Sequence, residues 1–406
     1  MALSKQIFNR LTGPFNVGIM DVAQKKFMGR LFYPSSLHCP TTSNDKINDS
    51  HPRKKPTFWH SEVTYLQNYE YLVDNKNQGW KHLEGIRLPE TVFYSPEFEL
   101  TGKTFPLIVH SHGLFGNRFN FSSVNSTLAS HGFVVLALEH NDGTANVTFR
   151  KNDLNYKDYR PYDKMIKYGI EANKFDQQHF LKRKEQMAIR NSEVLACLEF
   201  FSTDLSDEEK EKFSSDPEKG YSEIWPTEPY HIKNIVDVKT TNPILMGHSF
   251  GAASNLNLRT HPNAGDYFSK QILLDPWTFM IDHDLLERLQ EISDENYLAG
   301  ENNNLTVVSQ EFADNPKIIS KIKKIPNQKL QVARYSNHFS IGSDFALVHE
   351  KLNGKGFLSE KTIKDLAASD PDFLNLPVAC TNAGEIINYI NLNVLRFLHD
   401  DDSWTF

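Results

Sequence analysis

The sequence predicts an α/β fold in which a mostly parallel central sheet is covered by helices on both faces. Two observations support this prediction. Short apolar runs alternate with helical or polar stretches along much of the 406-residue chain, which is typical of parallel sheets. Near the middle, the apolar run 243–246 leads into Gly247-His248-Ser249-Phe250-Gly251, and the following stretch, 252–256, can start a helix. A strand, a sharp turn and a helix are the context in which G-x-S-x-G presents a nucleophilic serine.

The elements expected before the serine motif are four strands and one helix. Residues 12–34 mix Gly, Val, Phe and Tyr and predict a pair of strands, whereas the polar, proline-bearing residues 38–56 indicate a surface loop. The apolar runs 105–112 and 132–138 predict two buried strands. Between 186 and 201, apolar residues recur at helical spacing and predict a helix.

Three more strands are expected after the serine motif, at 271–274, 305–309 and 330–335. Helical or polar stretches separate them, so each strand can return to the same sheet in parallel. Ligands of such sheets bind at the carboxyl ends of the strands. We therefore expect the functional residues to follow these strands directly.

Length and composition allow one large α/β domain or two smaller ones. We expect a single α/β domain over residues 1–406, with a polar excursion at about 145–185 and an exposed acidic insertion at about 203–225. The chain is 39% hydrophobic and carries a net charge of −7. It has no basic stripe, which argues against nucleic acid as a partner. The oligomeric state is not encoded in any pattern of this sequence.

Targeting features favour a cytoplasmic protein. No run approaches the ~18 apolar residues of a membrane span, and residues 1–6 contain no apolar stretch of the signal-peptide type. Residue 2 is alanine, which excludes N-myristoylation of the sequence as it stands. Three cysteines far apart, Cys39, Cys197 and Cys380, fit reduced thiols.

Ser249 needs a base to take its proton and an acid to orient that base. In chains with this motif the order is serine, acid, histidine. The histidines after the serine are His261, His283, His338, His349 and His399. His338 is the preferred base because it lies in a turn directly after the predicted strand 330–335, whereas His261 and His399 are expected at the surface.

Two positions can supply the acid. Asp275 follows the predicted strand 271–274 in an apolar setting, where a carboxylate needs a partner to offset its desolvation. Asp314 and Glu311 follow the next strand and can also reach the histidine. Asp275 is preferred on these grounds, and the alternative is that it caps a helix before Pro276 and Trp277.

An oxyanion hole needs two backbone N–H groups that point at the developing negative charge. One is expected from Phe250, the residue after the nucleophile. The other is expected from Leu114, in the loop 112–116 after an earlier strand, where Gly113 and Gly116 allow a close approach to the ligand. The alternative is a tight turn without a catalytic role.

No cofactor or metal site is expected. His110 and His112 lie two residues apart at a strand end, and Glu139-His140-Asn141-Asp142 lies at another, but no H-E-x-x-H or paired-cysteine motif accompanies them. We expect these side chains to support the pocket rather than to bind an ion.

At these residues the chain resembles the platelet-activating factor acetylhydrolases of the plasma and intracellular type II group. The matching stretches follow the family's order from about residue 12 to about residue 350. They are Thr12-Gly13-Pro14, Arg30-Leu31-Phe32-Tyr33-Pro34, 105–107, Ser111-His112-Gly113-Leu114, 128–135, Leu138-Glu139-His140, 246–251, Leu274-Asp275 with Trp277, and His338 before Asp344-Phe345.

The resemblance implies an α/β-hydrolase fold and calcium-independent serine phospholipase activity. It implies that Ser249 is the nucleophile, Asp275 the acid and His338 the base, and it favours Asp275 over Asp314. Leu114 and Phe250 are implied as oxyanion donors. The chain departs from the family pattern at Ala252, where a second glycine is expected, and in the loop Phe115-Gly116-Asn117-Arg118.

The implied substrates are phospholipids with a short or oxidised sn-2 acyl group, platelet-activating factor among them. Transient contact with a membrane surface is also implied. Phe58, Trp59, Tyr65, Leu66 and Tyr69 can form an aromatic face for lipid, but core packing is the preferred interpretation. A general carboxylesterase or lipase with the same triad is the alternative, and an inactive hydrolase-fold binding protein is a third hypothesis.

Overall fold

The structure is a computed structural model, and it describes most of the predicted strands and helices. The described residues are 7–24, 26–37, 59, 85–94, 100, 102–149, 159–161, 177–202, 235–237, 242–262, 267–294, 303–353 and 382–400. The surface loop expected at 38–56 and the acidic insertion expected at about 203–225 lie outside these ranges.

The described chain begins with an antiparallel pair of strands, β1 (Phe15–Ala23) and β2 (Met28–Leu37), where the sequence predicts such a pair. The short strand β3 (Val92–Tyr94) lies parallel to β1. Strand β2 pairs with β5 (Val134–Leu138) in antiparallel fashion and so joins this pair to the rest of the sheet.

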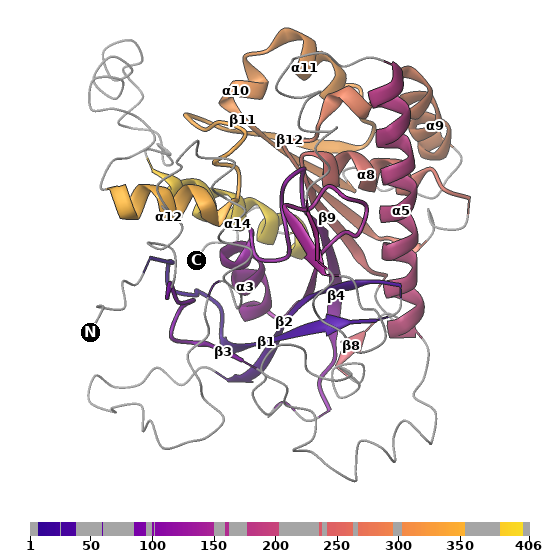
Figure 1. Ribbon diagram of the computed structural model, residues 1–406. Helices are drawn as coiled ribbons and strands as arrows, with labels where there is room; N and C mark the ends of the chain where they lie inside the picture. The colour runs from indigo at the N-terminus through magenta and orange to yellow at the C-terminus, as the bar shows by residue number, and fades with distance from the viewer. Residues whose placement is uncertain are drawn as a thin grey trace, which may run out of the picture.

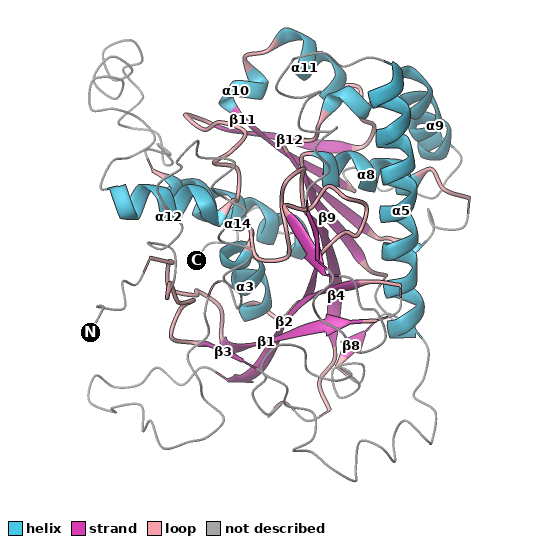
Figure 2. Cartoon of the chain, in the orientation of Figure 1, coloured by secondary structure: helices cyan, strands magenta, loops and turns pink. Residues whose placement is uncertain are grey.

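Six neighbouring strands form the main parallel part of the sheet, and all six were expected from the sequence. Within the described chain, ten strands form one sheet in the order β12-β11-β10-β9-β4-β5-β2-β1-β3, with β8 (Val236–Asp237) paired to β4 (Figure 2). The other members are β4 (Phe105–Ser111), β9 (Ile244–His248), β10 (Lys270–Leu274), β11 (Asn304–Ser309) and β12 (Gln328–Ala333). The prediction of a mostly parallel sheet is confirmed.

Helices cover both faces of this sheet (Figure 1). On one face lie α3 (Ser122–Ser130), α12 (Asp344–Asn353) and α14 (Ala383–His399). On the other lie α5 (Gln177–Ser202), α8 (Phe250–Arg259) and α9 (His283–Asp294). Successive residues of β4 divide between the two cores: Ile108 packs in the core that contains α14, and Leu107 packs in the core that contains α5.

Several predicted boundaries differ from the structure, and two of the differences have a clear physical reason. Strand β12 ends at Ala333, before the predicted end at 335, because Tyr335 has φ 60° and turns the chain out of the sheet. Helix α5 starts at Gln177 rather than at 186. Its first turns carry few apolar residues, so periodicity misses them, but the Leu, Lys, Arg, Glu and Gln there favour helix.

The polar excursion expected at about 145–185 is described only in part. Its described residues form two short antiparallel strands, β6 (Val147–Phe149) and β7 (Tyr159–Pro161), and the first turns of α5. The remainder lies outside the described residues.

The predicted aromatic face can be followed at one residue. Trp59 is fully buried, and its Nε1 donates a hydrogen bond to the carbonyl of Phe119 at 3.1 Å. Core packing, the preferred interpretation, therefore holds for Trp59. Phe58, Tyr65, Leu66 and Tyr69 lie outside the described residues.

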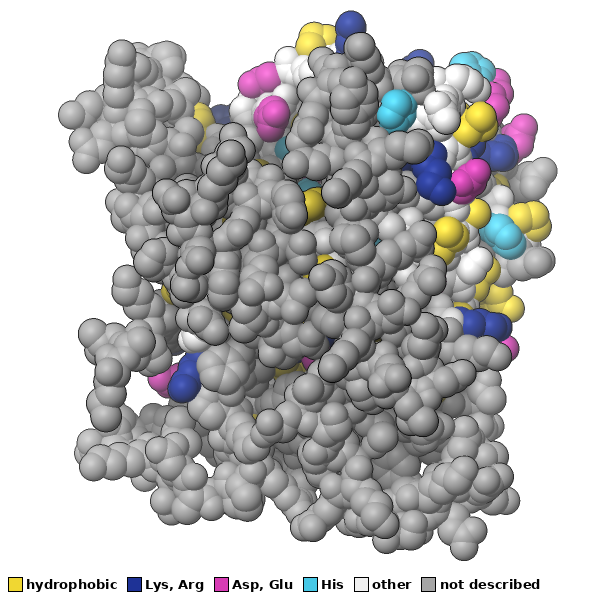
Figure 3. Space-filling view, in the orientation of Figure 1, with side chains coloured by type: hydrophobic (Ala, Val, Ile, Leu, Met, Phe, Trp, Pro, Cys, Tyr) yellow, Lys and Arg dark blue, Asp and Glu magenta, His cyan; other side chains and the backbone are white. Residues whose placement is uncertain are grey.

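Figure 3 shows the described surface around α9, α10 (Gln310–Ala313) and α11 (Pro316–Ile322), where acidic and basic side chains are interspersed.

Cys197 is a buried free thiol, and burial raises its pKa. Within the ranges given above, none of the helices is both long and apolar enough to cross a membrane.

A buried carboxyl group joins two helices on one face of the sheet. Asp344 begins α12 and is fully buried, and its Oδ1 accepts a hydrogen bond from the backbone N–H of Ser123 in the first turn of α3 at 3.1 Å. The Asp344 N–H donates to the carbonyl of Asn120 at 2.8 Å. Burial raises the pKa of Asp344 to about 8, although hydrogen bonds from Ser123, Ser122 and Trp59 oppose the shift.

The raised pKa of Asp344 predicts a pH-dependent stability. Between its ordinary value of 3.8 and about 8, the folded state holds a proton that the unfolded state has lost. The contribution of Asp344 to stability is therefore fully present at low pH and falls as pH rises through this window, by at most about 1.4 kcal/mol per pH unit. Asp344→Asn should remove this slope, which urea unfolding of both proteins across the window will measure. Parallel pH profiles would contradict the assignment.

Candidate active site

Ser249 stands at a sharp turn between β9 and α8. Its backbone has φ 54° and ψ −117°, a strained conformation that functional sites often retain. The Ser249 N–H donates to the carbonyl of Leu274 at 2.9 Å, which ties the turn to the neighbouring strand β10. The turn requires glycine nearby, because a β-carbon at position 251 would lie 2.1 Å from the carbonyl oxygen of Ser111.

His338 reaches the serine from the turn after the edge strand β12. Its Nε2 lies 2.9 Å from Ser249 Oγ. The Phe312 ring lies parallel to the imidazole with centroids 4.7 Å apart, and the ring of His248 stacks on it at 4.8 Å. The His338 N–H donates to the carboxylate of Glu311 at 2.9 Å, so both ring and backbone of this histidine are held.

Asp275 lies directly after β10 and completes a chain of hydrogen bonds. Its Oδ2 accepts from His338 Nδ1 at 3.0 Å. The N–H of Ser309 donates to Asp275 Oδ1 at 2.6 Å, and the Ser309 hydroxyl donates to Oδ2 at 2.7 Å. Because the proton on Nδ1 points at the carboxylate, Nε2 is left with a lone pair toward the serine hydroxyl.

The other candidates lie elsewhere. Asp314 is exposed and accepts a hydrogen bond from Gln310, and Glu311 binds the backbone of His338 rather than its ring. His261, His283 and His399 are exposed, and the side chain of His349 lies outside the described set. The structure therefore brings together Ser249, Asp275 and His338, the three residues that the resemblance implies.

The loop 112–116 after β4 passes beside the serine. A β-carbon at Gly113 would lie 3.0 Å from Ser249 Cβ, so no larger residue fits without displacement. Leu114 packs against the same apolar cluster as Phe250, together with Met187 and Met280. The N–H groups of Leu114 and Phe250 donate none of the hydrogen bonds found within the described part of the chain.

The departures from the family pattern are accommodated in the core. Ala252 is fully buried and packs with the apolar residues of α8, α9 and β10. Arg118, at the end of the divergent loop, is buried and pairs with Asp21 at 3.0 Å and with Glu139. Burial opposes ionisation of Asp21, but the guanidinium groups of Arg30 and Arg118 hold its pKa below the ordinary value.

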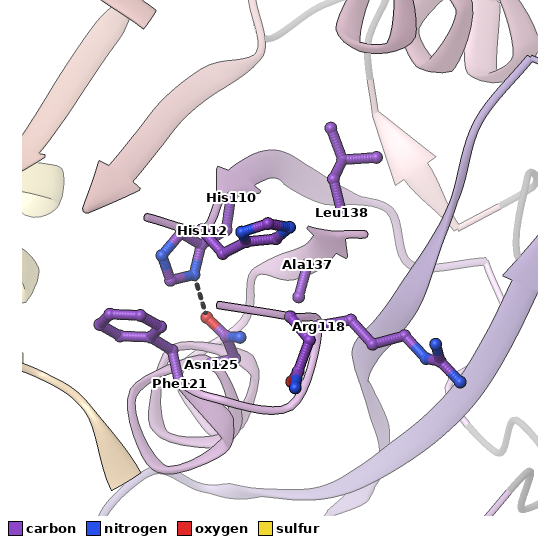
Figure 4. Close-up of a pocket in the computed structure, with 8 residues that line it drawn as sticks. His110, His112, Arg118, Phe121, Asn125, Ala137 and Leu138 are labelled. Atoms are coloured by element: carbon purple, nitrogen blue, oxygen red, sulfur yellow. Dashed lines mark hydrogen bonds between the residues drawn. The ribbon is translucent and has the colours of Figure 1, made fainter. Parts of the chain in front are cut away.

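Buried histidines lie at and beside the loop 112–116. His110 Nδ1 pairs with Asn125 Oδ1 at 2.8 Å across a small pocket (Figure 4). His112 Nδ1 donates to the carbonyl of Gly113 at 2.7 Å, and its Nε2 accepts from the N–H of His140 at 3.2 Å. Both nitrogens of His112 are thus engaged within the protein, which leaves none for a metal.

Burial keeps these imidazoles neutral. It lowers the pKa of His110 to about 4 and that of His112 to about 3. The pKa of His248 also lies well below its ordinary value, first because of burial and then because of the neighbouring His338. His248 Nε2 donates to the His338 carbonyl at 3.2 Å, so the second residue of the serine motif helps to hold the turn of His338.

Sequence reasoning missed Ser309, Phe312 and His248 as supporting residues. Ser309 ends β11 and caps the short helix α10, accepting a hydrogen bond from the Phe312 N–H. A serine between a strand and a helix is a recognisable cap signal. No comparable signal marks Phe312, because its stacking on His338 depends on how β11 and β12 lie side by side.

The site opens to solvent through an apolar rim. Ser249 is 5% exposed, whereas the side chain of His338 is 32% exposed. Phe339, next to the histidine, is 41% exposed, and Phe279 is 37% exposed and contacts Trp277. An arrangement of serine, imidazole and buried carboxylate can activate the hydroxyl as a nucleophile.

The chain matches a known protein family over most of its length. A family model described as "Platelet-activating factor acetylhydrolase, isoform II" matches residues 1–370. The platelet-activating factor acetylhydrolase of Canis lupus familiaris is 28% identical over 375 residues, which are 88% of this chain and 73% of that protein. That of Bos taurus is 26% identical over 295 residues, which are 70% of this chain and 58% of that protein.

Among solved structures, a ferulic acid esterase from Streptomyces cinnamoneus superposes with a TM-score of 0.50 at 14% identity. The match covers 96% of this chain and 90% of that chain. At this identity the likeness bears on the fold alone, and with the parallel sheet and its two helix layers it gives the chain an α/β-hydrolase fold.

Proposed function

The chain belongs to the platelet-activating factor acetylhydrolase isoform II family, and from this premise we propose that it is a calcium-independent serine hydrolase of phospholipids. The family and the fold support ester hydrolysis of the phospholipase or esterase type. The finer proposal is that the enzyme removes short or oxidised acyl groups, acetyl among them, from the sn-2 position of lipids such as platelet-activating factor.

The observation that carries this proposal is the hydrogen-bond chain from Ser249 Oγ through His338 to Asp275. In the proposed roles, Ser249 is the nucleophile, His338 the general base and Asp275 the carboxylate that orients the imidazole. Asp275 is fully buried, so its charge acts on His338 with little screening by water.

The mechanism that we propose is a two-step acyl transfer. Ser249 Oγ attacks the ester carbonyl carbon while His338 Nε2 takes its proton, and the oxyanion is held by the N–H groups of Leu114 and Phe250. His338 then protonates the departing lysophospholipid oxygen. Water, activated by the same nitrogen, attacks the acyl-enzyme and releases the acid and the free serine.

The apolar rim supports a lipid substrate reached from a membrane surface. Phe279, Phe339 and Trp277 offer aromatic surface beside the serine, and such rings suit the interface of a bilayer. We propose that the protein acts in the cytoplasm and meets membranes transiently.

A general carboxylesterase with the same triad is the alternative function. The intact hydrogen-bond chain from Ser249 to Asp275 argues against an inactive binding protein.

The test is hydrolysis of a phosphatidylcholine series that differs only in the sn-2 acyl chain, from acetyl to palmitoyl, with EDTA present. If the enzyme prefers short or oxidised acyl groups, as proposed, the acetyl and oxidised-chain lipids should be hydrolysed. The rate should fall steeply as the sn-2 chain lengthens. EDTA should have no effect on the rate.

Ser249→Ala is the control in this series and should abolish every turnover. Hydrolysis of simple esters without any phospholipid would reject the phospholipid proposal and favour the carboxylesterase. Equal rates for acetyl and palmitoyl lipids would reject the short-chain preference.

A further inference from the structure

A buried arginine in α5 contacts both segments that carry the proposed oxyanion donors. Arg190 is fully buried, in the middle of the helix. Its Nη1 donates to the carbonyl of His112 at 2.6 Å, and its Nε donates to Asp142 Oδ2 at 2.7 Å. Its guanidinium carbon lies 4.6 Å from the centre of the Phe250 ring. One side chain thus spans the loop after β4 and the start of α8.

The contacts hold the peptide units on both sides of the 113–114 peptide, which carries the N–H of Leu114. The carbonyl of His112, which Arg190 binds directly, lies before the 113–114 peptide whose N–H belongs to Leu114. The N–H of Phe115 lies after it and donates to the carbonyl of Thr144 at 2.7 Å. Thr144 is itself held by Arg190, whose Nη2 donates to its hydroxyl oxygen.

Asp142 links these two anchors. It accepts from Arg190 Nε, from the Thr144 N–H at 2.9 Å and from the Thr144 hydroxyl. Burial opposes ionisation of Asp142, but the charge of Arg190 and the hydrogen bonds from Thr144 outweigh it, so its pKa lies below the ordinary value. The Asp142 carboxylate is therefore favoured in its charged form beside the Arg190 guanidinium.

The loop needs this support because its own backbone is strained. Phe115 has φ 62°, a left-handed conformation that side-chain-bearing residues rarely adopt. Such a conformation persists only when the surroundings over-determine it. A lysine at 190 has the same charge, but its single ammonium group cannot reproduce the planar, forked set of donors.

We propose that Arg190 is a positioning residue of the oxyanion hole, which fixes the Leu114 N–H through His112 and Thr144 and supports Phe250 through its ring. This inference rests on the proposed serine-hydrolase function but not on the choice of lipid substrate. Misplacing one oxyanion donor should weaken binding of the transition state while leaving binding of the ground-state ester almost unchanged.

The test compares Arg190→Lys with Arg259→Lys. Arg259 is also buried in a helix and donates to a backbone carbonyl, that of Phe268 at 2.8 Å, so it is the matched control. Loss of one oxyanion donor lowers kcat about 10²- to 10³-fold, and misplacing a donor should cost less than losing it. With p-nitrophenyl acetate, Arg190→Lys should therefore lower kcat roughly ten- to hundredfold with KM unchanged. Arg259→Lys should keep the wild-type kcat.

A short-chain trifluoromethyl ketone adds a second readout. Ser249 adds to its carbonyl carbon, and the resulting oxyanion takes the place of the one formed in catalysis. Its inhibition constant should rise in Arg190→Lys by the same factor by which kcat/KM falls. An unchanged kcat in a folded Arg190→Lys protein, or a loss confined to KM, would overturn the proposal.

Thr144→Val keeps the test decisive if Arg190 variants do not fold. It removes the acceptor of Arg190 Nη2 while leaving the carbonyl that binds Phe115, and should lower kcat with KM unchanged. An unaffected kcat in this variant would also count against the proposal. Wild-type hydrolysis of the ester is measured first, and its absence would reject the serine-hydrolase function itself, separately from any effect at Arg190.

Discussion

Replacing Ser249 by alanine is expected to lower kcat for ester hydrolysis by about 10⁶-fold, the loss seen when a triad serine is removed. The variant lacks the oxygen that forms the acyl-enzyme, and nothing else at the turn can take its place. Alanine is smaller than serine and retains a β-carbon, so the strained backbone at φ 54° keeps the same environment. The melting temperature should therefore stay close to that of the wild type.

Ser126→Ala is the matched control for this experiment. Ser126 is fully buried in α3, and its hydroxyl makes no hydrogen bond with the described residues, so its loss removes a buried oxygen without touching the site. Hydrolysis rates and labelling by a fluorophosphonate should be lost in Ser249→Ala and retained in Ser126→Ala. Substantial hydrolysis by a pure Ser249→Ala protein would remove Ser249 from the nucleophile's role.

The second largest effect is expected at Asp275. Asp275→Asn should lower kcat about 10⁴-fold, because an amide that donates toward His338 favours the wrong imidazole tautomer. The carbonyl oxygen of the new amide can still accept from the Ser309 N–H, so the local structure should persist. Asp314→Asn is the matched control, since Asp314 is exposed and bonds only to Gln310 among the contacts described for its side chain.

The pair of variants decides between Asp275 and Asp314 as the acid. Normal activity in Asp275→Asn together with a crippled Asp314→Asn would reassign the acid. Rates should be measured near neutral pH and again at higher pH. Both tautomers of the neutral imidazole carry one proton, so raising the pH does not restore the correct tautomer. Wild-type activity of Asp275→Asn at either pH would contradict the proposed role.

The sequence predicted the parallel strands well because each is a short apolar run bounded by polar residues. Since the candidate residues directly follow such runs, the sequence alone placed Ser249 and His338 at the carboxyl ends of the parallel strands. The apolar setting of Asp275 favoured it over Asp314, but the residues alone did not exclude Asp314, because both follow strands. In the structure, Ser309 ends β11 and begins α10, and this short helix carries Asp314 outward.

Arg190 illustrates what a single sequence does not reveal. It lies in a helix whose preceding turns are rich in Lys, Arg and Glu, so its pattern resembles that of a solvent-exposed helix face. Its partners, His112, Asp142 and Thr144, are distant in the sequence and become neighbours only when α5 packs beside the loops after β4 and β5. Contacts of this kind depend on the packed fold and leave no local periodicity.

The position of β12 has a consequence for how activity and folding are related. It is the outermost strand on its side of the sheet and pairs with β11 alone among the described strands, yet the turn that follows it carries the proposed base. Segments with few buried side chains open more readily than the core of a native protein, and Ala333 is the only fully buried residue of β12. Detachment of β12 would withdraw His338 while the rest of the sheet stayed paired. Activity should therefore be lost when this one strand opens, before the sheet as a whole unfolds.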